Sequence, residues 1–155
     1  VDFSLAVFCT AAFALRRAPA PPAHRAVLRG AWDASSAGGP PAGRGGAFAR
    51  NPQFSLVVDT ACRAHLELQA PKELAVGLTL VGPGGRGGAR IDCVLVDEQV
   101  VSSGAFRRGF TFAETAELAA GVYTLVPSTF EPGQCGAFVL TVCTSAPLRA
   151  ARPIG

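Results

Sequence analysis

Cysteine and histidine are the residue types in this sequence that could carry nucleophilic or metal chemistry. The chain of 155 residues has five Cys and two His. A cysteine nucleophile needs a neighbouring base, and a metal site needs several ligands at suitable spacing. The cysteines form no Cys-x-x-Cys pair, and His65 stands in an alternating stretch as a surface residue would. We therefore expect no catalytic residue, no metal site and no cofactor, and interpret Cys93 and Cys143 as buried thiols and Cys135 as a thiol in a turn.

Two other stretches invite a functional interpretation that their context does not support. The glycine-rich run 82–88 lacks the Gly-Lys-Ser/Thr ending and the following helix of a phosphate-binding loop. It is interpreted as a hairpin loop. Acidic residues are sparse, with only Asp97 and Glu98 adjacent, whereas a calcium loop needs several converging carboxylates. Calcium binding built into this chain is therefore not expected.

The basic residues leave one binding hypothesis open. The 14 Lys and Arg residues are scattered and the formal net charge is only +3, which excludes the dense basic stripe of a nucleic-acid reader. Four of them could still form an edge that contacts anionic lipid or a protein partner. These are Arg86, Arg90, Arg107 and Arg108. Because each basic residue near an anionic surface contributes only about 1 kcal/mol, a solvated face is the competing interpretation.

Composition indicates one β-rich domain with a real core. Hydrophobic residues make up 49% and charged residues 16% of the chain, which argues against disorder. The 18 Gly and 12 Pro suit short strands joined by many turns. No stretch has sustained helical periodicity, and about eight segments alternate or carry a short apolar run. The sequence predicts an all-β antiparallel sandwich with strands at 25–32, 54–58, 64–69, 75–81, 91–96, 109–118, 122–126 and 137–143.

A short internal repeat suggests the domain boundaries. Residues 3–7 match 138–142 in pattern, which indicates that 1–17 are the last strand of a preceding sandwich copy. The proline-rich stretch 18–23 is then a linker, 24–148 the sandwich domain and 149–155 a tail. Since the chain contains no Met, we also expect it to be a piece of a longer protein.

The aromatic residues are expected to fill the core and to pin its ends. Trp32 should anchor the first strand. Pro127 should end a strand because it cannot donate to the ladder, and Phe130 should turn inward to close one end of the sandwich. Six further aromatic residues, spread over most strands, are expected in the interior. They are Phe54, Phe106, Phe110, Phe112, Tyr123 and Phe138.

Several of these residues stand in four ordered motifs. The first pairs Gly30-Ala31-Trp32 with Ala37-Gly38-Gly39, and the second is Asn51-Pro52-Gln53-Phe54. The third contains Gly121, Tyr123, Pro127, Phe130 and Pro132, and the fourth runs from Gly136 to Val142. In this order they resemble G-x-W…A-G-G, N-P-Q-F, G-x-Y-x-x-V-P-S-T-F-x-P and the closing strand of one family, the β-sandwich domain III that follows the protease core of calpains. Residues 103–109 are similar to a segment of the atypical PalB-type calpains, which carry this domain in tandem.

The resemblance implies a cytoplasmic cysteine endopeptidase as the parent protein and a non-catalytic part of it here. The family's catalytic Cys, His and Asn belong to an upstream core whose motifs are missing from this sequence. The acidic loop of typical calpain sandwiches is missing too. The implied partners are the protease core and the preceding sandwich of the same chain, with other proteins as further candidates. The alternatives are a peripheral module that binds anionic phospholipid through the arginines and a carbohydrate- or peptide-binding sandwich of an unrelated protein.

Overall fold

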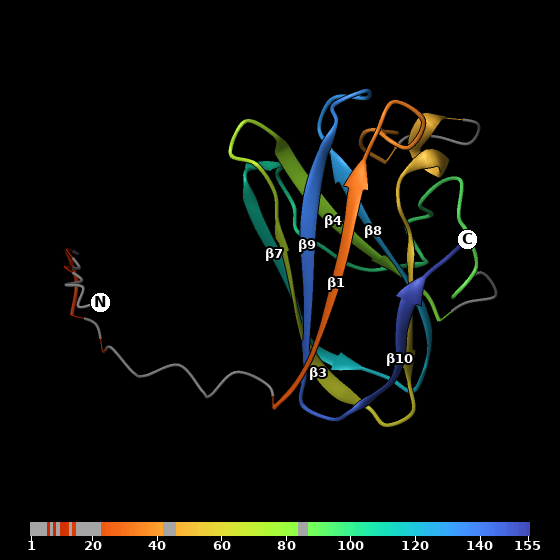
Figure 1. Cartoon of the computed structure of the whole chain (residues 1–155). Helices are drawn as coiled ribbons and strands as arrows, with labels where there is room; N and C mark the ends of the chain where they lie inside the picture. Colours follow the sequence, from red (N-terminus) through yellow and green to blue (C-terminus); the bar gives the residue numbers. More distant parts are fainter. Residues whose placement is uncertain are drawn as a thin grey trace.

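The computed structural model describes residues 6, 8, 10–12, 14, 23–41, 46–83 and 87–155. Most of the expected strand at 1–17 and of the linker at 18–23 lies outside these residues, and so does Arg86. The rest forms two antiparallel sheets packed face to face (Figure 1). This arrangement confirms the predicted antiparallel sandwich.

The described residues contain ten strands and one short 3₁₀ helix. In chain order they are β1 His24–Trp32, η1 Ala47–Arg50, β2 Phe54–Val58, β3 Cys62–Gln69, β4 Ala75–Val81, β5 Gln99–Ser102, β6 Arg107–Arg108, β7 Phe110–Leu118, β8 Gly121–Thr129, β9 Gly136–Thr144 and β10 Leu148–Pro153. Sheet A has the order β1-β9-β3-β7, and sheet B has the order β10-β2-β8-β4-β5 with β6 paired to β4.

Strict alternation in the strands builds the core between the sheets. In β3 the side chains of Ala64, Leu66 and Leu68 are buried, while His65 and Glu67 between them point to the other face. Leu140 of β9 and Leu125 of β8 are likewise fully buried and meet this row from both sheets. One apolar side chain in two along each strand is therefore enough to fill the interior.

Two parts of the sequence prediction are wrong in their element assignment. Residues 91–96 are not a strand: Ile91 is buried in a second small cluster with Phe48, Val81 and Val126, on the outer side of sheet B. Residues 91–96 are apolar because they pack over the outer side of sheet B, not because they form a strand. The next strand, β5, begins at Gln99. Residues 149–153 are not a tail, because β10 pairs with β2 along sheet B.

Pro127 lies inside β8 and does not end a strand, contrary to the prediction. It stands opposite Leu78 of β4. The backbone N and O of Leu78 bond to Ser103 instead, at 2.9 and 3.0 Å, so this pair exchanges no ladder hydrogen bond. On the other side of β8, β2 reaches only as far as Phe54, which stands opposite Leu125. The missing N–H of Pro127 therefore faces a position without a ladder partner.

The family motifs meet at this end of the sandwich. The Trp32 indole Nε1–H donates to the Pro127 carbonyl at 3.3 Å, and the Gly133 N–H donates to the Ala37 carbonyl at 2.9 Å. The buried Asn51 side chain accepts from the Gly38 N–H at 3.0 Å and donates to the Gly39 carbonyl at 2.8 Å. These contacts join three segments of the chain, 32–39, Asn51 and 127–133, and so hold this end of the sandwich together.

Gly38 and Gly39 are needed here for two different reasons. A Cβ on Gly38 would collide with the backbone carbonyl of Ala47. Gly39 has φ +77, which L side chains rarely adopt, and a Cβ there would lie 2.7 Å from the Pro132 ring. Close backbone approach thus explains the Gly-Gly pair next to Asn51.

The aromatic residues divide into a buried set and an exposed set, which corrects the expectation that all of them fill the core. Trp32, Phe54, Tyr123 and Phe138 are buried. Phe110, Phe112 and Phe130 are exposed, and Phe106 is half-buried. Phe130 does not close the end of the sandwich: its ring is 55% exposed and packs edge-on against Phe106 with centroids 5.6 Å apart.

We expect Phe130→Ala to lower the free energy of unfolding by about 1 kcal/mol or less, since only one edge of the ring is packed. Phe138→Ala should lower it by about 3–5 kcal/mol because that ring is enclosed by core residues. Urea unfolding followed by the fluorescence of the single Trp measures both. A loss of about 3 kcal/mol for Phe130→Ala would show that the ring is enclosed in solution.

Candidate interaction face

Sheet A presents an open outer surface, which we call the outer A face. The registers of its four strands align the outward side chains in rows. These side chains belong to Arg25, Val27 and Arg29 of β1, Val139, Thr141 and Cys143 of β9, His65, Glu67 and Gln69 of β3, and Phe110, Phe112 and Glu114 of β7. In Figure 1, β9 and β1 run across the front of the sandwich, so the view looks onto this face.

The β7 side of the outer A face carries an exposed aromatic pair. Phe110 and Phe112 are 42% and 40% exposed, and their ring centroids are 6.3 Å apart. The sequence-based prediction places both rings in the core. Pairing with β3 decides otherwise, because Thr111 stands opposite Leu68 and Ala113 opposite Leu66. The small residues of β7 must therefore point inward, and the large rings point to solvent.

Next to the aromatic pair, His65 is held between two carboxylates. Its Nδ1 lies 2.6 Å from Glu114 Oε1 and its Nε2 lies 2.9 Å from Glu67 Oε1. The ring also stacks on Phe112 at 5.7 Å. Burial would lower the pKa of His65, but the hydrogen bonds and negative charges of Glu114 and Glu67 outweigh it and raise this pKa above 6.5. The interpretation of His65 as a lone surface residue missed this cluster. Only the register of β3 against β7, which places Glu114 opposite His65, could have indicated it.

Because the pKa of His65 is raised in the folded state, its contribution to stability is full below the unfolded pKa of about 6.5. It disappears as pH rises through the folded pKa. We expect the difference in free energy of unfolding between the wild type and His65→Gln to be larger near pH 6 than near pH 9. Urea titrations of both proteins at each pH measure it. A difference that is constant or grows with pH would contradict this linkage.

The outer A face does not assemble a cysteine nucleophile. Cys143 stands opposite His65 in the register, which is the pairing that such chemistry would use. However, burial raises the pKa of the Cys143 thiol, as does the charge of Glu67, so that the thiolate is disfavoured. Both nitrogens of His65 already contact carboxylates. The described residues also contain no group of three or more His, Cys, Asp or Glu placed to hold a metal ion.

Among the cysteines that the structure describes, Cys93 is buried as predicted, whereas Cys143 is only half-buried, contrary to the prediction. Cys62 and Cys93 are buried, and Cys135 is exposed in a turn. Burial raises the pKa of the Cys62 thiol. Cys93 is buried in a loop, although it was predicted in a strand.

The outer side of sheet B, in contrast, is largely covered by the chain itself. The buried Gln53 side chain donates to the Ile91 carbonyl and accepts from the Ile91 N–H, both at 2.8 Å. Thr124 Oγ1 accepts from the Gly88 N–H at 3.0 Å and donates to the Ala89 carbonyl at 2.9 Å. These bonds fasten the loop after residue 86 onto the sheet. The outward residues of sheet A are exposed or half-buried, except for Thr141, which is buried.

The arginines proposed for lipid or partner contact do not meet in one cluster within the described residues. Arg90 Nη2 lies 3.5 and 3.4 Å from the carbonyls of Arg50 and Asn51, before β2. Arg107 and Arg108 lie on β6 beside β4, and Arg108 donates to the Glu73 carbonyl at 3.2 Å. Strand β8 runs between β2 and β4. The arginines therefore form two separate basic positions.

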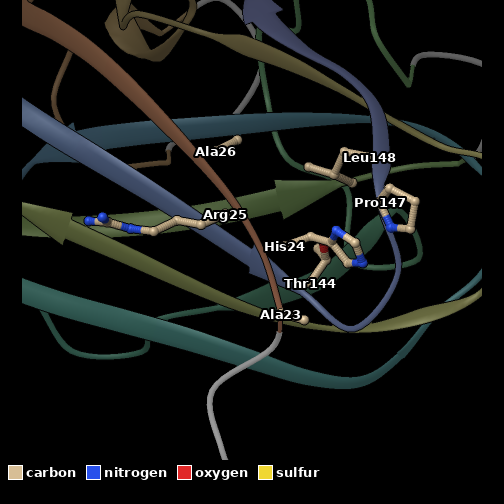
Figure 2. A pocket seen from close by; sticks show the side chains of 7 residues that line it. All are labelled: Ala23, His24, Arg25, Ala26, Thr144, Pro147 and Leu148. Carbon is tan, nitrogen blue, oxygen red and sulfur yellow. The ribbon is translucent and has the colours of Figure 1, made fainter.

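A shallow groove lies at the end of the sandwich that is opposite to the contacts of Trp32, Asn51 and Pro127. It has a volume of about 310 Å³ and opens between the start of β1 and the turn that joins β9 to β10. Figure 2 shows its lining residues, which are Ala23, His24, Arg25, Ala26, Thr144, Pro147 and Leu148. The Arg25 side chain extends away from the others. The groove holds no pair of groups suited to acid–base chemistry.

The fold and its open face define an antiparallel β-sandwich module, and the comparison with known families is consistent with its motifs. The family model for domain III of the calpain large subunit matches residues 28–143. The chain belongs to the calpain domain III family.

The relatives belong to whole proteins that are much longer. Calpain-like protease palB of Emericella nidulans is 32% identical over 145 residues, which cover 93% of this chain and 16% of that protein. Calpain-like protease palB/RIM13 of Aspergillus oryzae is 33% identical over 151 residues, which cover 96% of this chain and 17% of that protein. Calpain-7 of Mus musculus is 28% identical over 159 residues, which cover 96% of this chain and 18% of that protein. These matches confirm the resemblance to PalB-type calpains, and the chain spans only 16–18% of the length of these three relatives.

Membrane insertion through a helix has no support in the described residues. The longest helix there is η1, with four residues, and no helix reaches the length and apolar character that crossing a bilayer requires.

Proposed function

We propose that this chain is a non-catalytic interaction module of a cytoplasmic, calpain-like cysteine protease. It docks on other parts of the same parent chain, the protease core and the preceding sandwich, through the β7 side of the outer A face. The observation that carries this proposal is the exposed pair Phe110 and Phe112 on an open sheet, while the outer side of sheet B is largely covered by the chain's own loops.

The chemistry of the face supports a protein surface as the occupant. Exposed aromatic rings are enriched at protein interfaces because they bury large areas at a small entropic cost. The cluster of His65 with Glu67 and Glu114 borders the rings and supplies a polar rim. Cys62, Cys93, Cys135 and Cys143 are all free, which fits a reducing compartment, where disulfides are rare.

The docking test uses the 155-residue chain and the remainder of the parent protease, expressed separately. We expect them to associate, and the double variant Phe110→Ser with Phe112→Ser to weaken the affinity at least about tenfold, since central aromatic side chains dominate interface energies. Val122→Ser is the matched control, because Val122 is 39% exposed on β8 of sheet B. An equal loss in control and double variant, or no association, would contradict the proposed docking face.

The catalytic half of the proposal is tested separately. The isolated chain should not cleave casein, with or without calcium. Thiol-dependent cleavage that a single Cys→Ala substitution abolishes would overturn the assignment as a non-catalytic module.

Lipid binding stays as the second candidate, favoured only by the exposed arginines of β6. If it is correct, the chain should sediment with anionic liposomes at low salt and dissociate at high salt, because exposed charges are screened. Binding that persists in the double variant Arg107→Glu with Arg108→Glu would remove the β6 arginines from this role.

A further inference from the structure

The first strand of the domain has a long unpaired edge. β1 is the terminal strand of sheet A and pairs with β9 over all nine residues, from His24 to Trp32, without a bulge. Its other edge pairs with no strand among the described residues, although β10 of sheet B approaches it without pairing. Natural sheets usually protect such an edge by shortening it, bulging it or placing Pro on it, because a free row of N–H and C=O groups can pair with another chain. β1 has none of these three devices, and the charges of Arg25 and Arg29 are the edge protection that it carries.

Beside this edge lies the groove of Figure 2. It is lined on one side by Ala26 of β1 and on the other by Pro147 and Leu148, at the start of β10. β10 is the terminal strand of sheet B, so the groove opens between the edges of the two sheets. Leu28 and Ala151 continue this seam as partly buried apolar residues. A strand added to β1 would therefore direct every second side chain toward this apolar seam, and the side chain opposite Ala26 would find room in the groove.

The opposite face of β1 is positively charged. Arg25 and Arg29 flank Val27 on the outer A face, and all three are exposed. Neither arginine has an ion-pair partner within the part of the chain that the structure describes. Directly opposite positions on neighbouring strands interact most strongly, so acidic residues four apart on an added strand would meet both arginines.

The two arginines also act against the simplest alternative occupant, a second copy of this chain. An antiparallel copy centred on Val27 would place Arg25 of each copy opposite Arg29 of the other, and like charges directly opposite destabilise a strand pair. The chain cannot supply the acidic strand either, since no two of its 11 Asp and Glu residues are four apart in the sequence.

We propose that β1 binds an extended acidic segment of a separate protein by strand addition to sheet A. The segment carries acidic residues at positions i and i+4 facing Arg29 and Arg25, and an apolar residue between them, at i+3, that enters the groove beside Ala26. Main-chain hydrogen bonds to the free edge provide affinity, while the arginines and the groove provide specificity. This site goes beyond the proposed docking within the parent protease and lies at the opposite edge of sheet A from Phe110 and Phe112.

The probe is a fluorescein-labelled, acetylated peptide, Thr-Glu-Val-Val-Leu-Glu-Thr, titrated into the 155-residue chain with fluorescence anisotropy as readout. We expect saturable binding that weakens at least about tenfold in the double variant Arg25→Glu with Arg29→Glu. The same variant should bind a peptide with Lys in place of Glu better than the wild type does. Arg107→Glu with Arg108→Glu, on another edge strand, is the matched control and should bind as the wild type. Absence of binding, or equal loss in both double variants, overturns the proposal.

Strand addition itself is tested with two N-methylated peptides. Methyl groups on alternate backbone nitrogens block one edge of a strand and leave the other edge free. We expect one methylation pattern to abolish binding and the other to be tolerated, and the amide signals of His24 to Trp32 to shift most in nitrogen-proton NMR spectra. Equal effects of the two patterns, or shifts centred away from β1, would contradict strand addition.

Two further outcomes identify a different occupant. Sedimentation velocity of the chain without peptide should show a monomer, and a dimer that Arg25→Glu disrupts would assign the edge to a second copy. The peptide should also bind the full-length parent protease. Binding by the 155-residue chain that is lost in the full-length protein would assign the edge to a segment of the parent, and either result overturns the proposal of a separate partner.

Discussion

Trp32→Ala should be the most damaging of the single substitutions, with a loss of about 3–5 kcal/mol in the free energy of unfolding. The Trp32 ring is 1% exposed and packs on Phe138 with centroids 4.4 Å apart. Its indole N–H also bonds the Pro127 carbonyl. The substitution therefore opens a cavity at the end of the core and leaves a buried carbonyl without its partner.

The measurement needs a probe other than fluorescence, because Trp32 is the single Trp of the chain. Urea unfolding followed by far-ultraviolet circular dichroism serves both proteins. Trp32→Phe keeps an apolar ring but lacks the indole N–H, so it should cause a smaller loss than Trp32→Ala. If Trp32→Ala destabilises the protein by less than about 1 kcal/mol, Trp32 does not anchor β1 in solution.

Asn51→Ala should also lower the free energy of unfolding strongly, by about 2–4 kcal/mol, although Asn51 is polar and lies outside every strand. The side chain is completely buried and bridges the Gly38 N–H and the Gly39 carbonyl. Alanine leaves both backbone groups without a partner in a region that water does not reach, and each orphaned group costs about 1–3 kcal/mol. The loop between β1 and η1 should loosen together with its contact to Gly133.

Gln69→Ala is the control for the loss of an amide side chain, because Gln69 is exposed on the outer A face. It should change the free energy of unfolding by no more than about 0.5 kcal/mol. Asn51→Asp adds a second check: it keeps the acceptor for Gly38 but removes the donor to Gly39, so it should also destabilise. Similar small effects for Asn51→Ala and Gln69→Ala would show that the hydrogen bonds of Asn51 with Gly38 and Gly39 do not stabilise the fold.

Much of the fold could be predicted because alternation is a local property. Residues 64–69 alternate so strictly that only a half-buried strand satisfies both faces, and the structure has β3 there. The motif segments around Trp32, Asn51 and Pro127 resemble the family so closely that their order pointed to one fold, and the family match over residues 28–143 confirms it. Neither observation requires knowledge of which strands are neighbours.

The errors arose where a residue's position depends on its spatial neighbours. Residues 148–153 have a weak strand signal and a Pro, yet pairing with β2 makes them β10. Residues 91–96 are apolar because they cover sheet B, and the same pattern is typical of a buried strand. Pro127 is tolerated inside β8 because its own missing donor faces a position that β2 does not reach.

The candidate interaction face could not be derived from alternation alone. A period of two separates the side chains of β7 into two sets but does not state which set faces the core. Phe110 and Phe112 are the better core residues by size, whereas the register with Leu66 and Leu68 of β3 directs Thr111 and Ala113 inward. His65 acquired its two carboxylates in the same way, from Glu67 on its own strand and Glu114 across the ladder.

Residue types and spacings alone are sufficient to identify this chain as a strand-rich sandwich of the calpain type without the motifs of the protease core. Each of those conclusions rests on one segment of the chain at a time. Three-dimensional packing was needed to establish that the outer side of sheet B is largely covered and the outer A face open. It was also needed to establish that, among the described residues, no strand pairs with the second edge of β1, which carries Arg25 and Arg29 and borders the groove. These features depend on which strands pair and in which register, and that choice is made by the packing of the whole core.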